Sequence, residues 1–177
     1  MSLPIGKCSG DGLVHLLKDK GQLTGLEIGC AEGHTTLYLL QSLPDIKLYG
    51  VDPYMDYIDW NTNHLDNREN VYQQFKSNVM DKYPGRFELY RLTSDDAVSK
   101  FEDESLDFIF IDGIHTYDQV LTDCRHFYPK VKKNGLFAGH DYTWVTDVGK
   151  AVNVFKEEVG AKDVSLTTYD VWYWYKH

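Results

Sequence analysis

The sequence predicts an α/β fold, in which one mostly parallel sheet is covered by helices on both of its faces. Segments with the apolar pattern of strands alternate with segments of helical spacing, and no internal repeat or linker-like tract interrupts them. The segment from Leu106 to Ile111 is almost continuously apolar, which is typical of a central parallel strand buried on both sides. We therefore expect residues 1–177 to form a single domain.

The spacing of apolar residues places the elements in order along the chain. Segment 1–20 contains a helix, which is marked by leucines at helical spacing. Further helices are expected at 35–43, 71–80, 95–101, 117–128 and 145–159, and strands at 23–28, 47–51, 87–92, 106–111 and 136–139. Two closing strands near 164–168 and 171–175 flank a turn at Tyr169-Asp170, which predicts a C-terminal antiparallel hairpin.

Local signals mark the ends of the helix that follows the central strand. Thr116 and Gln119 have the spacing of a capping box, which places the start of this helix. Pro129 ends its apolar pattern, because proline cannot continue a helix. The basic segment 130–133 is interpreted as a solvated helix end near a turn.

Composition narrows the classes of function. A net charge of −9 and a pI near 5.1 disfavour nucleic acid as the partner, because binding the phosphate backbone needs clustered Lys and Arg. Cys8, Cys30 and Cys124 lack any paired metal-binding spacing, which favours a reduced, cytoplasmic setting. No apolar run reaches the length of a membrane span, and residues 1–25 do not have the order of a signal peptide.

Polar residues that could carry chemistry follow two successive apolar strands. Asp112 and His115 come after one strand, and His140 and Asp141 come after the next. Ligands of open α/β sheets bind at such strand ends, and neighbouring parallel strands lie only about 5 Å apart. These side chains could therefore converge on a hard divalent cation. Alternatively, the two aspartates only begin loops and His115 is a loop residue without a role.

A second motif, "LEIGCAEGHTT", ends the first strand. Gly29 and Gly33 bracket a tight strand-to-helix turn, where a ligand can approach the backbone closely. Asp52 ends the second strand, where an acidic residue can accept hydrogen bonds from ribose hydroxyls. Together with Glu27 inside the first strand, these residues predict a nucleoside-containing cofactor. Ala31 replaces the second glycine of a nicotinamide-binding fingerprint, so a nicotinamide is disfavoured.

The same residues resemble a known superfamily. Glu27 two residues before Gly29 resembles motif I of the class I S-adenosylmethionine-dependent methyltransferases, which have a Rossmann-like sheet of seven strands. Within that superfamily, "IDGIHTYDQVLTDC" and "NGLFAGHDY" resemble the metal-dependent O-methyltransferases related to macrocin O-methyltransferase and, more distantly, catechol O-methyltransferases. The resemblance covers residues 23–177.

The resemblance implies a set of residues that bind S-adenosylmethionine. Gly29 and Gly33 would line its methionyl end, and Asp52 would hold its ribose. Ser94 and Asp95 would flank the adenine. The full set implied at the cofactor is Glu27, Gly29, Gly33, Asp52, Pro53, Ser94, Asp95 and Asp112.

The resemblance also implies a metal and a catalytic base. Asp112 and Asp141 would be metal ligands with His140 as their neighbour, and His115 would act as the general base. Mg or Mn is the expected cation. The family more often carries Asp or Glu at the position of His140, and imidazole suits Mn, Fe or Zn better than Mg.

The implied reaction is metal-assisted methylation of a hydroxyl on a small molecule, such as a sugar or a glycosylated metabolite. Two alternatives remain: a non-catalytic domain that binds S-adenosylmethionine and serves in interaction, and a metal-free methyltransferase that acts on nitrogen or carbon. The ring-rich loop 53–67 could act as a lid over cofactor and substrate, or its rings could pack locally. The sequence carries no prediction of oligomeric state.

Overall fold

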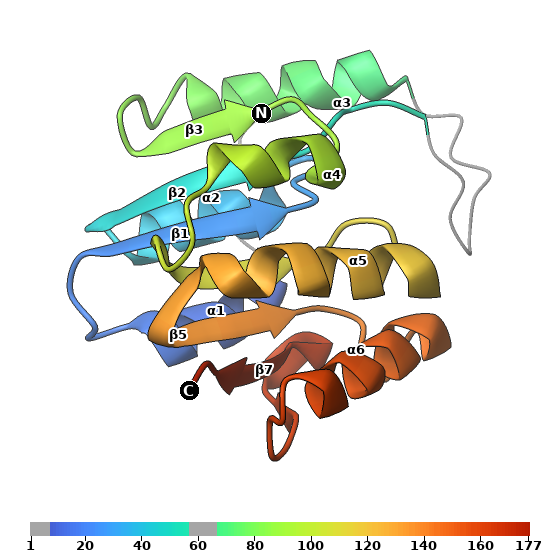
Figure 1. Cartoon of the computed structure of the whole chain (residues 1–177). Coiled ribbons are helices and arrows are strands. Elements are labelled where there is room, and N and C mark those ends of the chain that lie inside the picture. Colours follow the sequence, from blue (N-terminus) through green and yellow to red (C-terminus); the bar gives the residue numbers. More distant parts are fainter. Residues whose placement is uncertain (1–7, 57–66) are drawn as a thin grey trace.

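The computed structural model describes residues 8–56 and 67–177 and shows a seven-stranded sheet between two layers of helices (Figure 1). The strand order is β3-β2-β1-β4-β5-β7-β6, with β1 to β5 parallel and β7 antiparallel to both of its neighbours. The predicted fold class and the C-terminal antiparallel hairpin are therefore confirmed.

The elements alternate along the chain as the apolar spacing predicts. The strands are β1 Leu23–Ile28, β2 Ile46–Val51, β3 Phe87–Tyr90, β4 Leu106–Ile111, β5 Val131–Gly139, β6 Ser165–Leu166 and β7 Trp172–Tyr175. The α-helices are α1 Ser9–Leu17, α2 His34–Ser42, α3 Arg68–Phe75, α4 Ser94–Ala97, α5 Tyr117–Phe127 and α6 Thr146–Glu158. Shorter helical segments are η1 Lys76–Met80, η2 Val98–Lys100, η3 Tyr128–Lys130 and η4 Thr168–Asp170.

The core is divided into two clusters by the sheet. Alternate residues of the central strand β4 serve both, because Phe108 and Phe110 pack on the side of α1, α2 and α3 while Ile109 and Ile111 pack on the side of α4, α5 and α6. Figure 1 shows the second group of helices in front of the sheet and α1 and α2 behind it. All four of these β4 side chains are at most 5% exposed, as expected of a strand covered on both faces.

The start of β5 differs from the prediction. The strand begins at Val131 and not near Leu136, so Lys132 and Lys133 belong to a strand and not to a solvated helix end. The pairing of β5 with β4 shifts its register near Asp107, and Lys132 forms an ion pair with that residue at 2.7 Å. The first part of β5 was not predicted because polar residues interrupt the apolar pattern of this irregular strand.

Helix α5 begins where the sequence predicts, but its first turn is not capped in the predicted way. Thr116 occupies the N-cap position, but its side chain makes no capping hydrogen bond, so the predicted capping box is wrong. The Gln119 side chain is used elsewhere: its Nε2 donates to the Ser94 hydroxyl at 3.2 Å and to the Asp123 carboxylate at 3.0 Å. A tertiary partner, Ser94, and a residue one turn along the same helix, Asp123, have taken the place of the local cap.

Most of the expected lid loop lies outside the described residues, which omit 57–66. Within the described part, Tyr54 is 4% exposed, packs against Phe75 and donates from its hydroxyl to the Ala31 carbonyl at 3.0 Å. This ring packs locally. No helix in residues 8–56 and 67–177 is long and apolar enough to cross a membrane.

Candidate cofactor cavity and metal centre

A cavity of about 560 Å³ opens at the carboxyl ends of β1, β2 and β4. This is the topological switch point of the sheet. From β1 the chain continues to β2 and β3 on one side, and the later strands β4 and β5 lie on the other side of β1. Five of the residues expected at a cofactor line it: Gly29, Asp52, Pro53, Ser94 and Asp112.

The turn after β1 is shaped by the closeness of β4. Gly29 has a φ of 85°, and a Cβ at this position would stand 2.0 Å from the carbonyl oxygen of Asp112. The amide of Asp112 donates in turn to the carbonyl of Ile28 at 2.8 Å. Only glycine fits here, so the floor of the cavity is bare backbone.

Asp52 joins the ends of β1 and β2. Its Oδ2 accepts hydrogen bonds from the amides of Cys30 at 3.0 Å and Ala31 at 2.9 Å, and its Oδ1 accepts from the amide of Tyr54 at 2.8 Å. These bonds fix the carboxylate at the cavity and brace the turn around it. These three bonds leave one acceptor site of the carboxylate, on Oδ1, that can still serve a ligand.

Three residues that were expected at the cofactor lie outside the cavity lining. Glu27 is 1% exposed, and its carboxyl pairs with the Thr36 hydroxyl at 2.5 Å; burial raises the pKa of Glu27 to about 8. Gly33 is the N-cap residue of α2, where a Cβ would press on the side chains of Phe75 and Val79. Asp95 is exposed and lies 3.5 Å from His126. Their positions suit structural roles in the protein without ligand.

Two polar residues of α5 line the cavity that sequence reasoning missed. Asp123 is 1% exposed, and burial raises its pKa to about 6. Gln119 lies between this carboxyl group and Ser94. One signal was available, because Asp123 falls at helical spacing among the apolar residues Val120 and Phe127.

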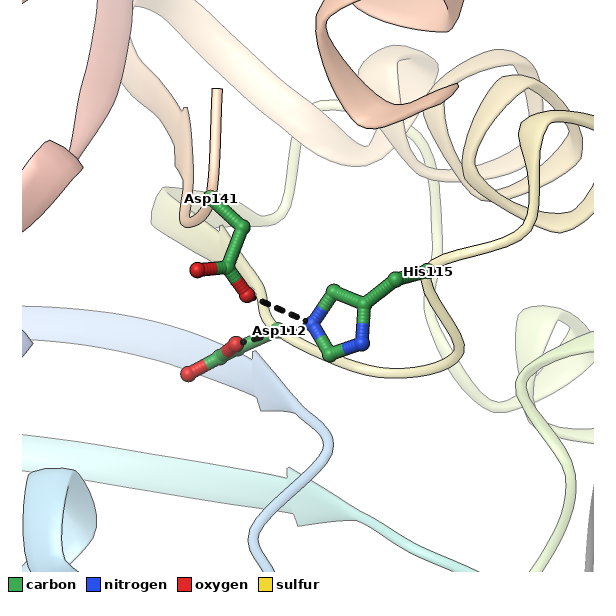
Figure 2. Close-up of side chains that lie close together, drawn as sticks. All are labelled: Asp112, His115 and Asp141. Atoms are coloured by element: carbon green, nitrogen blue, oxygen red, sulfur yellow. Dashed lines mark ion pairs between the residues drawn. The ribbon is translucent and has the colours of Figure 1, made fainter. Parts of the chain in front are cut away.

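The aspartates and histidines at the ends of β4 and β5 come together, as Figure 2 shows for three of them. The Nε2 of His115 lies 2.9 Å from Asp141 Oδ2 and 3.5 Å from Asp112 Oδ1. One ligand atom from each of Asp112, His115 and Asp141 lies within 4.8 Å of the others, an arrangement that could hold a metal ion.

His140 approaches the same carboxylates through its Nδ1. This atom lies 3.5 Å from Asp112 Oδ1 and 3.3 Å from Asp141 Oδ1. The ring of His140 also meets that of Trp144, with centroids 5.4 Å apart. His140 is therefore a neighbour of the three-residue group in space as well as in sequence.

Charge is balanced within this cluster. Burial alone would raise the pKa of Asp112 and Asp141, but hydrogen bonds with His115 and His140 outweigh it and lower both pKa values. Burial alone would lower the pKa of His140, but its two aspartate partners raise it to about 10. A divalent cation between the carboxylates would supply the positive charge that the imidazoles otherwise provide.

A family model described as a methyltransferase domain matches residues 26–142 of this chain. The chain belongs to the methyltransferase domain family. Its matched part runs from the second half of β1 through β5 and thus holds both the cavity and the cluster. The protein is an S-adenosylmethionine-dependent methyltransferase with a Rossmann-like sheet, which confirms the resemblance to class I enzymes at the level of the superfamily.

Individual relatives are distant. An uncharacterized protein of Acanthamoeba polyphaga mimivirus is 28% identical over 159 residues, which cover 86% of this chain and 68% of that protein. A putative caffeoyl-CoA O-methyltransferase from Staphylococcus aureus has a TM-score of 0.70 at 17% identity, covering 99% of this methyltransferase and 86% of that chain. The O-methyltransferase NovP has a TM-score of 0.71 at 16% identity, covering 94% and 77%. At such identities the two structures support the fold.

Proposed function

We propose that this methyltransferase transfers the methyl group of S-adenosylmethionine to a hydroxyl oxygen of a small molecule, assisted by a divalent cation. One observation carries the proposal: Asp112 both lines the cavity and belongs to the Asp/His cluster. An acceptor oxygen held at the cluster would therefore lie beside the cofactor. Positioning of this kind is a major source of acceleration in transfer between two bound molecules.

The cavity residues fit the cofactor. The bare backbone at Gly29 allows a ligand to approach where a side chain would block it, and the fixed carboxylate of Asp52 is suited to ribose hydroxyls. When bound, S-adenosylmethionine supplies a methyl group activated by its sulfonium. The task of the protein is then to align the acceptor oxygen with this group and to accept its proton.

The cluster fits a divalent cation. Two carboxylates and one imidazole with their ligand atoms within 4.8 Å are a donor set that suits Mn, and Mg less well. A bound cation lowers the pKa of a coordinated hydroxyl, so a mild base suffices to remove its proton. We assign Asp112 and Asp141 as ligands and retain His140 as a less central neighbour.

His115 has two candidate roles. The sequence predicts a general base, whereas the 2.9 Å approach of its Nε2 to Asp141 favours a third metal ligand, because this nitrogen cannot bind a metal and accept a proton at once. We propose the ligand role. The two roles differ in their measurable consequence, since loss of a ligand weakens metal binding and loss of a base does not.

The test is turnover with a panel of acceptors, such as glycosides, catechols and amines, with and without a chelator. We expect a hydroxyl acceptor to be methylated, the chelator to abolish turnover, and Mn or Mg to restore it. Asp141→Asn should lose turnover, whereas Asp147→Asn, which changes an exposed carboxylate on α6, should keep it. His115→Ala should lower turnover by about 10²- to 10⁴-fold and, in the ligand role, should also weaken Mn binding.

Each alternative gives a different result in this assay. Full turnover after exhaustive chelation would show that the reaction needs no metal. Methylation of amines alone would show that the acceptor atom is nitrogen and not oxygen. Binding of S-adenosylhomocysteine without turnover on any acceptor would favour a non-catalytic module. Unchanged Mn affinity in a slow His115→Ala variant would return this residue to the role of general base.

The acceptor class rests on likeness and on charge. The resemblance to macrocin O-methyltransferase-like enzymes favours a sugar or glycosylated metabolite, and two structural neighbours are named as O-methyltransferases. A net charge of −9 offers no attraction to a phosphate backbone. A small hydroxyl-bearing molecule is the acceptor that agrees with all of these.

A further inference from the structure

A partly buried polar network lines one part of the candidate cofactor cavity. It consists of Ser94 at the start of α4 and Gln119 and Asp123 on α5, all of which line the cavity. Gln119 Nε2 donates to Ser94 Oγ at 3.2 Å and to Asp123 Oδ1 at 3.0 Å. The network thus links the loop after β3 to the helix after β4.

Asp123 is unusual for its position. It is 1% exposed and lies on the apolar face of α5, where its neighbours Val120, Cys124 and Phe127 are all buried. A buried carboxyl group costs free energy unless polar partners compensate it. Gln119 provides one partner at Oδ1. Its Oδ2 would lie 4.0 Å from a Cβ at Gly113, so the missing side chain of that residue leaves this oxygen uncrowded beside the β4 loop.

The strand ends that carry the other lining groups indicate which part of the cofactor would meet this network. Asp52 and Gly29 lie at the ends of β2 and β1, where the ribose is expected, and Asp112 lies toward the metal cluster, where the methyl group must be delivered. The adenine must then extend away from the cluster. The polar lining from α4 and α5, together with Arg68 of α3, remains for it.

We infer that Asp123 recognises the adenine of S-adenosylmethionine by accepting a hydrogen bond from its exocyclic amino group, with Gln119 holding the carboxylate in place. An ionised carboxylate only accepts hydrogen bonds, so it pairs with an amino group and repels a carbonyl oxygen at the same position. Burial raises the pKa of Asp123 to about 6, although its hydrogen bonds with Ser94 and Gln119 act in the opposite direction. The carboxylate is therefore the main form at pH 7.5.

The inference makes Asp123 a specificity residue for the purine. It is distinct from Asp95, which the family resemblance implies beside the adenine and which is exposed in the structure. It rests on the cofactor of the family and not on the metal or on the acceptor atom. A binding measurement can therefore test it even if the proposed O-methylation fails.

The experiment compares the affinities of the full-length protein for S-adenosylhomocysteine and S-inosylhomocysteine, in which a carbonyl oxygen replaces the amino group. Calorimetry at pH 7.5 should show that the wild type prefers the adenine compound by roughly 10- to 100-fold. Asp123→Asn should bring this ratio close to one, because an amide can donate to the carbonyl oxygen. Asp118→Asn changes an exposed carboxylate of the same helix and should keep the wild-type ratio.

Several outcomes would overturn the inference. Equal affinity of the wild type for both compounds would do so without any variant, which covers the case that Asp123→Asn does not fold. A wild-type ratio in folded Asp123→Asn would assign the carboxyl group to packing alone. If the affinity ratio fell to about one in Asp95→Asn and stayed at the wild-type value in Asp123→Asn, Asp95 would be the residue that recognises the adenine.

Discussion

At the scale of single residues, Asp52 has a structural task, and we propose that it also binds the cofactor. Its carboxylate accepts three backbone hydrogen bonds, from Cys30, Ala31 and Tyr54, and it also lines the cofactor cavity. The same bonds that shape the turn after β1 therefore orient the carboxylate before any ligand arrives. Such preorganisation lowers the cost of ordering the site on binding.

We predict that Asp52→Ala weakens the binding of S-adenosylhomocysteine by about 1.5 to 3 kcal/mol, because charge-assisted hydrogen bonds to the ribose are lost. Calorimetry of the wild type and the variant measures the difference. Asp45→Ala, which removes an exposed carboxylate just before β2, is the matched control and should bind as the wild type does. Equal affinities for all three proteins would show that Asp52 does not bind the ribose.

The sequence predicted the site residues unevenly. Asp112, His115 and Asp141 were placed near one another because the ends of adjacent parallel strands meet at one edge of a sheet, and the structure brings them together. Asp123 and Gln119 were missed because they belong to a helix. Whether a helical residue reaches a cavity depends on how the helix docks on the sheet, and apolar spacing does not give that rotation precisely enough.

At the scale of elements, the turn between β1 and α2 depends on a close approach of two strands. The Cβ that Gly29 lacks would stand 2.0 Å from a backbone oxygen of the β4 loop, which a rotamer change cannot relieve. At Gly21, by contrast, φ is also positive at 76°, but no atom lies within 4 Å of a Cβ. Substitutions at Gly21 and Gly29 therefore distinguish two contributions to the loss of stability: a strained backbone conformation at both positions, and a steric clash at Gly29 alone.

We predict that Gly21→Ala costs about 1 kcal/mol of unfolding free energy, the usual penalty for a side chain in the left-handed region. Gly29→Ala should cost several-fold more, roughly 3 kcal/mol or above, because β1 and β4 must also separate. Urea denaturation of the two variants and the wild type measures both values. Similar losses of unfolding free energy at the two positions would show that separating β1 from β4 costs little.

Elements were predictable where their pattern was regular. The parallel strands β1, β2 and β4 appear within a residue of their expected bounds, since each is an apolar run between turn signals. The start of β5 was missed because its exposed residues Lys133 and Asn134 sit in an irregular pairing. The insertion of β7 between β5 and β6 was also absent from the sequence reading, because hairpin signals give the partner strand but not the place in the sheet.

At the scale of the whole molecule, buried titratable groups give the metal-free protein a marked dependence of stability on pH. The pKa of Glu27 rises from 4.5 to about 8 and that of Asp123 from 3.8 to about 6, in both cases through burial. Between the ordinary and the raised pKa, the unfolded chain has lost the proton that the folded protein keeps. The free energy of unfolding therefore falls as pH rises through this window.

We predict that the unfolding free energy of the chelator-treated protein decreases from pH 5 to pH 8. Each fully shifted group contributes up to about 1.4 kcal/mol per pH unit. Glu27→Gln should flatten this dependence, whereas Glu88→Gln, at an exposed position of β3, should not. Denaturation curves at constant ionic strength measure the slopes. Parallel slopes for wild type and Glu27→Gln would mean that the buried carboxyl group titrates normally.

The other shifted groups act at the edges of this range. The lowered pKa values of Asp112 and Asp141 stabilise the fold above their ordinary range, and this part is lost in acid as pH falls through the folded values. The raised pKa of His140 stabilises the fold below 6.5 and is lost as pH rises toward about 10. The metal-free protein should therefore be most stable in mildly acidic solution.

The position of β7 in the sheet has a consequence for synthesis on the ribosome. It pairs with β5, and Trp172 donates from its ring nitrogen to the carbonyl of His140, so it supports the strand end that carries the Asp/His cluster. Until residues 172–175 leave the exit tunnel, the apolar end of β5 is an unpaired edge, which is prone to wrong pairing. A nascent chain can thus complete the loops after β1 and β2 well before the strand end that carries the Asp/His cluster gains its neighbour β7.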